Sequence, residues 1–179
     1  MRVGNGKWES TQFNSRLQPT QIALGTVQSG TDKLKLEFTY NTPGLNNNNG
    51  NVLSQTITVP TEVRNNITYN GFTANQAYVY DSLNRIKPAT EKVSGQSGNN
   101  SQQTFQYDRF GNSRFDAANT TTLLQSNNIT NPTIDIATNR FTAGQNYVYD
   151  KTGNLTFDAE GRQFVCDAEK DQTEVKCRG

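Results

Sequence analysis

The chain has 179 residues, of which 32% are apolar and 18% are charged, and its 17 basic and 16 acidic side chains nearly cancel. This balance argues against disorder driven by charge repulsion, and against nucleic-acid binding, which usually requires a clear excess of Lys and Arg. No apolar run approaches the roughly 18 residues that cross a bilayer, so we expect no membrane span. No apolar stretch follows Arg2, so we expect no signal peptide in this chain.

The sequence contains no histidine. It therefore lacks Ser-His-Asp and Cys-His nucleophile pairs, an imidazole proton shuttle and histidine metal ligands. Any catalysis would have to depend on carboxylates, Lys, Tyr or Cys. We therefore expect no enzyme, no metal site and no cofactor. Uncharged polar side chains dominate instead, because Asn, Thr and Gln supply 60 of the 179 residues.

Strand signals in residues 1–37 are weak, and we interpret this part as a β segment with eroded repeats. Strands are predicted at residues 22–27 and 34–38, and residues 13–17 could be a worn repeat. Residues 52–59 predict a further strand, which Pro60 ends. Polar, Gly- and Asn-rich stretches predict the loops. These loops lie near residues 41–51, 94–103 and 119–139.

A short motif recurs from residue 38 onward: an aromatic residue, any residue, Tyr and Asp. The clear copies are Tyr78-Val79-Tyr80-Asp81, Phe105-Gln106-Tyr107-Asp108 and Tyr147-Val148-Tyr149-Asp150. Degenerate copies occupy residues 38–41 and 164–167. The period of two puts both aromatic side chains on one face of a strand, and the Asp lies where the strand ends. The steps from Tyr40 to Tyr80, Tyr107 and Tyr149 suggest a unit of about 20 residues, with some copies eroded.

The residues after each Asp predict a tight turn. Asn or Gly follows three positions after the Asp, in the pairs Asp81 and Asn84, Asp108 and Gly111, Asp150 and Gly153, and Asp158 and Gly161. This is the chemistry of a type I turn: the Asp side chain caps the turn, and Gly or Asn tolerates the positive φ that follows. A second strand comes next, so each repeat is a β-hairpin.

One hairpin cannot bury its aromatic face alone. We therefore predict an all-β protein in which consecutive antiparallel β-hairpins pair edge to edge and form a curled, open repeat sheet. The repeat region spans residues 38–170. Residues 171–179 are predicted to be a polar C-terminal tail.

The pattern resembles the YD-repeat, or Rhs (rearrangement hot spot), family, to which the teneurins are similar. Its clearest copy runs from Tyr147 through Asp150, Gly153 and Asn154 to Asp167. The resemblance implies a segment of a β-shell from a larger, bacterial secreted or cell-surface protein of the polymorphic-toxin kind. The chain is too short for a closed shell and lacks the family's core motif and a toxin domain. The implied partners are the rest of such a shell or neighbouring copies.

The resemblance gives the repeat residues a structural role, with no catalytic residue among them. These residues are Tyr78, Tyr80, Asp81, Tyr107, Asp108, Gly111, Asn112, Tyr147, Tyr149, Asp150, Gly153, Asn154, Asp158 and Gly161.

Other interpretations of the same residues stay open. The turn aspartates could be acid/base pairs or calcium ligands, although their spacing is that of neither. The aromatic ladder could stack sugars, which would make the chain a carbohydrate- or protein-binding surface module; packing within the sheet is the competing interpretation. Unpaired strand edges rich in Asn, Gln and Thr could also favour self-association.

Two further motifs are ambiguous. Cys166 and Cys177 could close a disulfide loop in an oxidising compartment, or could be two unpaired thiols. Sequons for N-glycosylation begin at Asn66, Asn119, Asn128 and Asn154. In a chain this rich in Asn and Thr, we attribute the sequons to composition.

Overall fold

The fold is taken from a computed structural model, which describes residues 1–122 and 130–177. The chain divides into two compact units. Unit 1 comprises residues 1–104 and 119–121, and unit 2 comprises residues 105–118 and 122–179. Strand β9 belongs to both units, because the boundary falls after Thr104.

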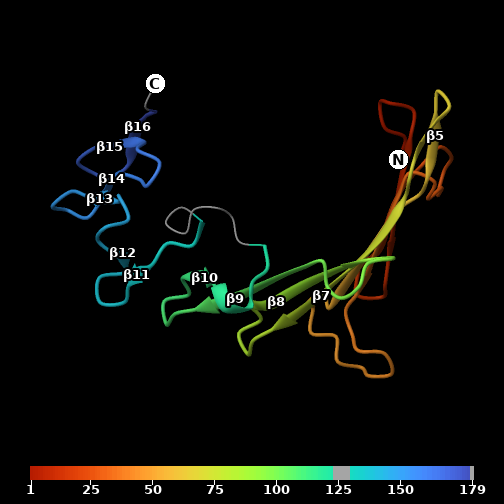
Figure 1. Cartoon of the computed structure of the whole chain (residues 1–179), viewed down its shortest axis with the longest axis horizontal. Coiled ribbons are helices and arrows are strands. Elements are labelled where there is room, and N and C mark those ends of the chain that lie inside the picture. The colour runs from red at the N-terminus through yellow and green to blue at the C-terminus, as the bar shows by residue number, and fades with distance from the viewer. Residues whose placement is uncertain (123–129, 178–179) are drawn as a thin grey trace. The chain divides into compact units, whose positions relative to one another are not determined.

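Strands account for almost all of the regular structure in the described residues (Figure 1). The strands are β1 (Trp8–Phe13), β2 (Pro19–Gly25), β3 (Leu34–Thr39), β4 (Ser54–Val59), β5 (Glu62–Arg64), β6 (Ile67–Tyr69), β7 (Phe72–Tyr80), β8 (Ile86–Val93), β9 (Ser101–Tyr107), β10 (Ser113–Phe115), β11 (Ile134–Asp135), β12 (Arg140–Phe141), β13 (Val148–Tyr149), β14 (Leu155–Phe157), β15 (Gln163–Cys166) and β16 (Gln172–Lys176). One 3₁₀ helix, Ala117–Asn119, follows β10.

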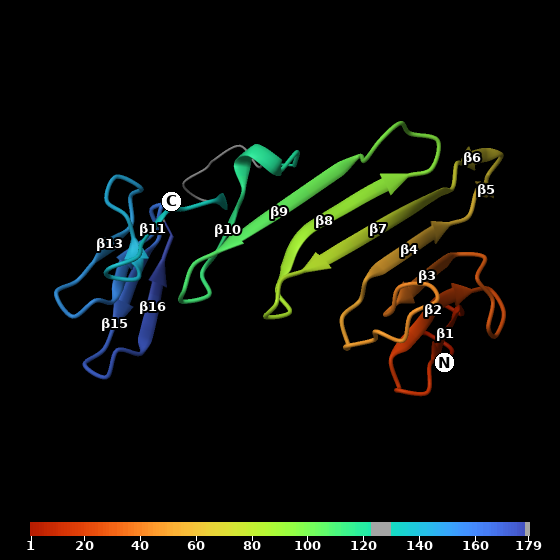
Figure 2. The same cartoon turned by 90° about the horizontal axis from the view of Figure 1, so that it is seen from below.

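Unit 1 is built on one antiparallel sheet, in which β1, β2, β3, β4, β7, β8 and β9 follow one another (Figure 2). The sheet order departs from the chain order only where β5 and β6 form a separate hairpin between β4 and β7. The chain returns from this hairpin at Gly71, where a Cβ atom would lie 2.2 Å from the carbonyl oxygen of Val59. Glycine is therefore required at the return.

One face of this sheet carries most of its apolar side chains. Ile22, Leu36 and Ile57 are cross-strand partners in register, and Ala74 extends the row. Within unit 1, the strand contacts in the described residues are contacts between sheet neighbours, so no other strand of that unit packs across either face of its sheet. Ile22, Leu36 and Ile57 accordingly stay half-buried.

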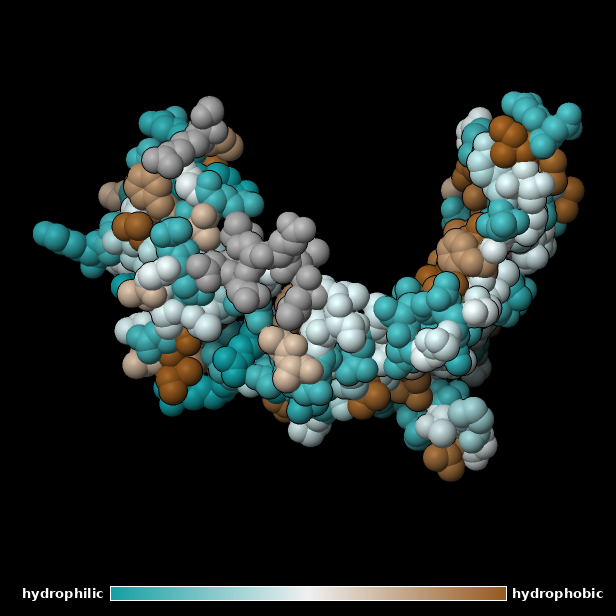
Figure 3. Space-filling view, in the orientation of Figure 1, coloured by the Kyte–Doolittle hydropathy of each residue, from teal (hydrophilic) through white to brown (hydrophobic). Residues whose placement is uncertain are grey.

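The core is therefore thin. Among apolar residues in the described chain, only Ala23, Tyr40 and Ala74 are buried, with exposed fractions of 1%, 6% and 2%. Apolar side chains remain at the surface between polar ones (Figure 3). Stability must come mainly from strand pairing and from the turns that join the strands.

Unit 2 contains smaller antiparallel sheets. Strands β13, β14, β15 and β16 form a four-stranded sheet in chain order, and β11 pairs with β12. The last three residues of β9 pair with β10, and the rings of Phe105 and Phe115 face each other across that pair at 5.1 Å. The rings of Phe141 and Tyr147 stack at 4.0 Å.

The sequence prediction of an all-β chain with antiparallel, unclosed sheets is confirmed. The strands expected at residues 22–27, 34–38 and 52–59 are found as β2, β3 and β4, with shifted ends. Hairpin partners were also placed correctly after Asp108, Asp150 and Asp158, where β10, β14 and β15 follow.

Three expected loop or tail segments contain strands. The loop expected at residues 94–103 ends earlier, because β9 begins at Ser101. Within the stretch 119–139, β11 occupies Ile134–Asp135, and residues 123–129 lie outside the described part. Residues 172–176 of the expected tail form β16, because their backbone pairs with β15, although all five side chains are exposed. The prediction from composition therefore assigned β16 to a tail, because this strand is stabilised by backbone pairing and not by buried side chains.

Candidate functional site

The most regular feature of the structure is a five-residue turn, which we call the Asp turn. Asp150 shows its geometry. The backbone N–H of Asp150 donates to the carbonyl oxygen of Asn154 at 3.0 Å, and the N–H of Gly153 donates back to the carbonyl of Asp150 at 3.2 Å. The Oδ1 atom of Asp150 accepts the backbone N–H groups of Thr152 and Asn154, both at 2.9 Å. Gly153 has a φ of 96°.

The same set of four hydrogen bonds occurs at six places in the described chain, always with a residue of positive φ at the fourth position. The turns begin at Asn14, Asp81, Asp108, Asp150, Asp158 and Asp167. The fourth residues are Leu17, Asn84, Gly111, Gly153, Gly161 and Lys170. Four of these turns match the prediction from sequence. The Asn14 and Asp167 turns were not predicted, because Leu17 and Lys170 stand where Gly or Asn was expected.

The fifth residue of the turn completes it by donating to the second carboxylate oxygen. Arg85 and Arg162 donate through Nε, at 2.8 and 2.6 Å, to Asp81 and Asp158. Asn112 and Asn154 donate through Nδ2, at 2.7 and 3.0 Å, to Asp108 and Asp150.

The two unpredicted turns depart from this pattern. In the Asn14 turn the direction is reversed, since the Asn14 amide donates to Gln18 Oε1 at 2.9 Å. In the Asp167 turn the fifth residue is Asp171, which donates to Asp167 only through its backbone N–H and brings a second carboxyl group in place of an amide or guanidinium donor.

At four of the turns, hydrogen bonds favour the charged form of the Asp carboxylate. The pKa of Asp150 is lowered to about 2, first by the backbone N–H of Asn154. The pKa of Asp81 is lowered mainly by the backbone N–H of Arg85, and that of Asp108 mainly by the Asn112 side chain. At Asp158 burial acts to raise the pKa, but the hydrogen bonds from Arg162 outweigh it and the pKa is lowered. These carboxylates are held as turn acceptors.

The tyrosine before the turn is held by its hydroxyl group. Tyr80 donates to the carbonyl oxygen of Val52 at 2.8 Å, and Tyr40, at the matching position of a degenerate copy, donates to Pro19 at 2.9 Å. Tyr149 accepts the backbone N–H of Phe141 at 3.2 Å. Burial raises the pKa of both Tyr40 and Tyr80.

The expected alternation of the aromatic motif is present. Tyr78, Tyr80, Tyr107, Tyr147 and Tyr149 are all half-buried. Between the paired tyrosines, Val79 and Val148 are exposed by 56% and 49%. The aromatic side chains therefore lie against the sheet but keep part of their surface open.

The proposed disulfide does not fit the strand register. Both cysteines are free thiols. Cys166 pairs with Gln172 in the β15–β16 hairpin, whereas Cys177 follows Lys176, which pairs with Gln163. The two cysteines are thus about four residues, or roughly 13 Å, apart along the hairpin, and a disulfide needs Cα atoms closer than about 7 Å. Closing the bond would require β16 to leave β15.

The structure also places together residues that sequence reasoning did not connect. A shallow hollow of about 290 Å³ lies over β7, β8 and β9 in unit 1, on the sheet face that carries most of the apolar side chains. Its lining residues are Gln76, Tyr78, Ala89, Thr90, Glu91, Ser101 and Gln103. Tyr78 and Gln103 stand on either side of Ala89, and Gln76, Glu91 and Ser101 form the adjacent cross-strand row. These residues are brought together only by the cross-strand register, which the sequence does not reveal. Among them, the sequence analysis had singled out only Tyr78, as part of the aromatic motif.

Hydrogen bonds fix one wall of this hollow. The Tyr78 hydroxyl donates to Gln76 Oε1 at 2.6 Å, and Gln76 Nε2 donates to Glu91 Oε2 at 2.7 Å. The pKa of Tyr78 is raised, mainly by burial and also by the nearby Tyr80 and Glu91. Within the described part of the chain, the Ser101 hydroxyl and the Gln103 amide have no hydrogen-bond partner.

In the described residues, no group of three or more Cys, Asp or Glu side chains is placed to hold a metal ion. The same residues contain no helix long and apolar enough to cross a membrane. Comparison with known proteins gives no matching family model and no significant match among curated sequences.

Proposed function

We propose that this chain is a structural segment of a YD-repeat, Rhs-type β-shell within a larger secreted or cell-surface protein, with no catalytic activity of its own. The observation that carries the proposal is the Asp turn, repeated at six places with one set of hydrogen bonds. A wall built from repeated hairpins requires a recurring turn, because each hairpin then presents its edge strand to the next hairpin in the same way.

The single-layer architecture of the unit 1 sheet supports a structural role in a shell wall. In unit 1 the row Ile22, Leu36 and Ile57 is half-buried, and no other described strand of the same unit packs over it. A sheet that is one layer thick buries little apolar surface and gains stability when more strands extend it. The partners of this proposal are therefore neighbouring strands of the same shell, or further copies of the chain.

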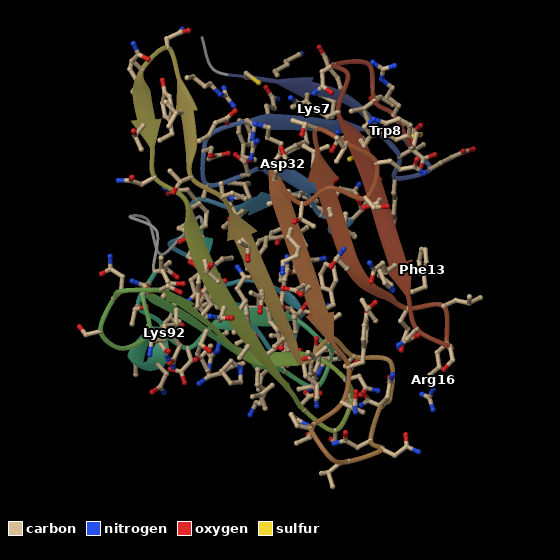
Figure 4. All side chains as sticks on the ribbon, turned by 90° about the vertical axis from the view of Figure 1, so that its right-hand side faces the viewer. Lys7, Trp8, Phe13, Arg16, Asp32 and Lys92 are labelled. Atoms are coloured by element: carbon tan, nitrogen blue, oxygen red, sulfur yellow. The ribbon has the colours of Figure 1, made fainter. Side chains whose placement is uncertain are left out.

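One sheet edge of unit 1 is suited to such an extension. Strand β1 lies at this edge, with Trp8 near one end and Phe13 near the other (Figure 4). Glu9 pairs its backbone with Met1, so alternation along the strand directs the backbone groups of Thr11 outward. Phe13 is 58% exposed. An adjoining strand would cover these groups.

The decisive experiment is to sequence the DNA on both sides of the reading frame. We expect further segments that combine an aromatic residue, any residue, Tyr and Asp with Gly or Asn three positions after the Asp. The extended chain should then unfold at a higher urea concentration than the present one, because added strands cover the open edge. Flanks without such segments would refute the shell proposal.

A second role is favoured by a separate observation. The hollow beside Tyr78 combines an aromatic wall with hydrogen-bonding groups that have no partner in the described chain. Such a surface is suited to ligand binding, as in a carbohydrate-binding module.

A further inference from the structure

The hollow on β7, β8 and β9 has the chemistry of a small polar binding site, and this inference goes beyond the wall role. All of its lining residues belong to unit 1. At about 290 Å³ it lies just below the usual volume range of ligand pockets, so it suits a single ring rather than an extended ligand.

The charge of the lining residues restricts the ligand. Glu91 is the only charged side chain among them. One of its oxygens accepts from Gln76, and the other accepts no hydrogen bond in the described part of the chain. A phosphate or an acidic sugar would meet this carboxylate with no Lys or Arg in the lining to neutralise it. A neutral ligand that can donate a hydrogen bond fits better.

The polarity of the lining restricts it further. An apolar ligand would cover Glu91, Ser101 and Gln103 and leave their polar atoms without water or partners, which is costly. A polyhydroxylated ligand can instead donate to Glu91 and exchange hydrogen bonds with the other two. Ala89 adds no bulk to the floor, and the Tyr78 ring supplies an apolar wall whose hydroxyl is already held by Gln76.

We propose that this hollow binds one neutral saccharide residue, with Tyr78 as the packing surface and Glu91, Ser101 and Gln103 as the hydrogen-bonding groups. The hydrogen bonds from Tyr78 to Gln76 and from Gln76 to Glu91 hold the Tyr78 and Glu91 side chains in position before a ligand binds. A shallow site for a single ring gives weak binding, with Kd on the order of millimolar.

The test is a titration of the full ¹⁵N-labelled chain followed by NMR. The probes are glucose, galactose, mannose and N-acetylglucosamine, with galacturonate as the anionic probe and benzyl alcohol as the apolar probe. We expect at least one neutral sugar to shift the backbone amides of residues 76–78, 89–91 and 101–103, and neither galacturonate nor benzyl alcohol to shift them as strongly.

Two variants and a matched control localise the site. Gln103→Ala should weaken the binding several-fold without harming the fold, because the Gln103 side chain makes no hydrogen bond in the described chain. Glu91→Gln should weaken it as well. Gln12→Ala removes the same side chain from the exposed strand β1 and should leave binding unchanged.

The proposal is overturned if no neutral sugar shifts these amides at roughly 100 mM, a concentration far above the expected Kd. It is equally overturned if galacturonate or benzyl alcohol binds more tightly, or if Gln103→Ala binds like the unmodified chain. The titration uses the chain alone, so a failure of the shell proposal, judged from flanking repeats, would leave this result unaffected.

Discussion

Asp158 receives two hydrogen bonds from Arg162, four residues later: the backbone N–H donates to Oδ1 at 2.9 Å, and Nε donates to Oδ2 at 2.6 Å. The Asp158 residue is 6% exposed, the most buried of the turn acids. The Asp158 side chain therefore accepts from both the backbone of its turn and the guanidinium of Arg162, which directly precedes β15.

Replacing Asp158 tests how much one turn contributes. Asp158→Ala removes the acceptor for the N–H groups of Glu160 and Arg162, and we expect a loss of about 1–2 kcal/mol in the free energy of unfolding of unit 2, the range for a lost helix cap or an unmet hydrogen bond. Asp158→Asn keeps the Oδ1 acceptor and should lose less. Urea unfolding of both variants measures the difference. Equal losses would show that charge, not the Oδ1 geometry, stabilises the turn.

A second prediction concerns Leu17, which adopts a φ of 60° in the Asn14 turn and is 81% exposed. A left-handed conformation costs a residue such as Leu roughly 1 kcal/mol, whereas Asn tolerates it. Leu17→Asn should therefore raise the free energy of unfolding of unit 1 by about 0.5–1 kcal/mol. The control is Leu83→Asn, one position earlier in the Asp81 turn, where φ is not positive and no gain is expected. A gain of the same size in both variants would contradict the argument from φ.

The Asn14 turn also shows how far the sequence could predict the structure. The turns at Asp81, Asp108, Asp150 and Asp158 were predictable because Asp, Gly and Asn have local conformational preferences that act within five residues. The turn at Asn14 has the same hydrogen bonds, but Leu17 conceals it, because strand pairing on both sides holds Leu17 in a conformation it does not prefer.

The hollow and strand β16 were not predictable for a different reason. Glu91 and Ser101 meet only through the register of β8 with β9, and no local preference sets that register. Strand β16 has five exposed side chains, so no apolar alternation marks it. Its position is fixed by backbone hydrogen bonds to β15, which any residue except proline can make.

The pH dependence of stability follows from Asp150. Its pKa is about 2 in the folded chain, mainly because the Asn154 backbone N–H donates to it, against about 3.9 in an unfolded chain. Between these values the unfolded chain binds more protons, so stability rises with pH in this window. The contribution of Asp150 should be complete above about pH 4 and should be lost as the pH falls through about 2.

Asp150→Asn removes this titration while keeping the Oδ1 acceptor. Thermal unfolding midpoints measured from about pH 2 to 6 should fall less steeply in acid for this variant than for the unmodified chain. Glu9→Gln, which removes an exposed acid outside the turns, should leave the slope unchanged. The same acid slope in Asp150→Asn and the unmodified chain would show that Asp150 does not contribute.

A fourth prediction concerns the tyrosine hydroxyls. Tyr40 donates to the backbone carbonyl of Pro19 at the start of β2, and Tyr80 donates to that of Val52, which precedes β4; Tyr40 is only 6% exposed. Changing either residue to Phe leaves a carbonyl without its donor, so we expect each variant to lose about 1 kcal/mol, with the larger loss at Tyr40. Tyr69→Phe is the control, since Tyr69 is 54% exposed and its hydroxyl makes no hydrogen bond in the described chain. Urea unfolding that ranks Tyr69→Phe with the other two would contradict the role of these hydroxyls.

The Asp167 turn contains the one fifth residue whose side chain has no amide or guanidinium donor. Asp108 and Asp150 are each followed four positions later by an Asn whose amide reaches the second carboxylate oxygen, whereas Asp167 is followed by Asp171. Asp171→Asn supplies the missing donor and removes a like charge, so it should stabilise the β15–β16 hairpin by about 0.5–1 kcal/mol. Slower amide hydrogen exchange in β15 and β16 would measure this gain.

Glu169→Gln separates the two causes of that gain. It removes the same charge from the same turn, but residue 169 contributes only its backbone N–H to Asp167. Exchange should therefore slow in Asp171→Asn and change little in Glu169→Gln. If both variants slow exchange equally, relief of charge repulsion accounts for the effect. If neither variant slows exchange, the side-chain hydrogen bonds that Asn112 and Asn154 donate to their turn aspartates do not stabilise the turn.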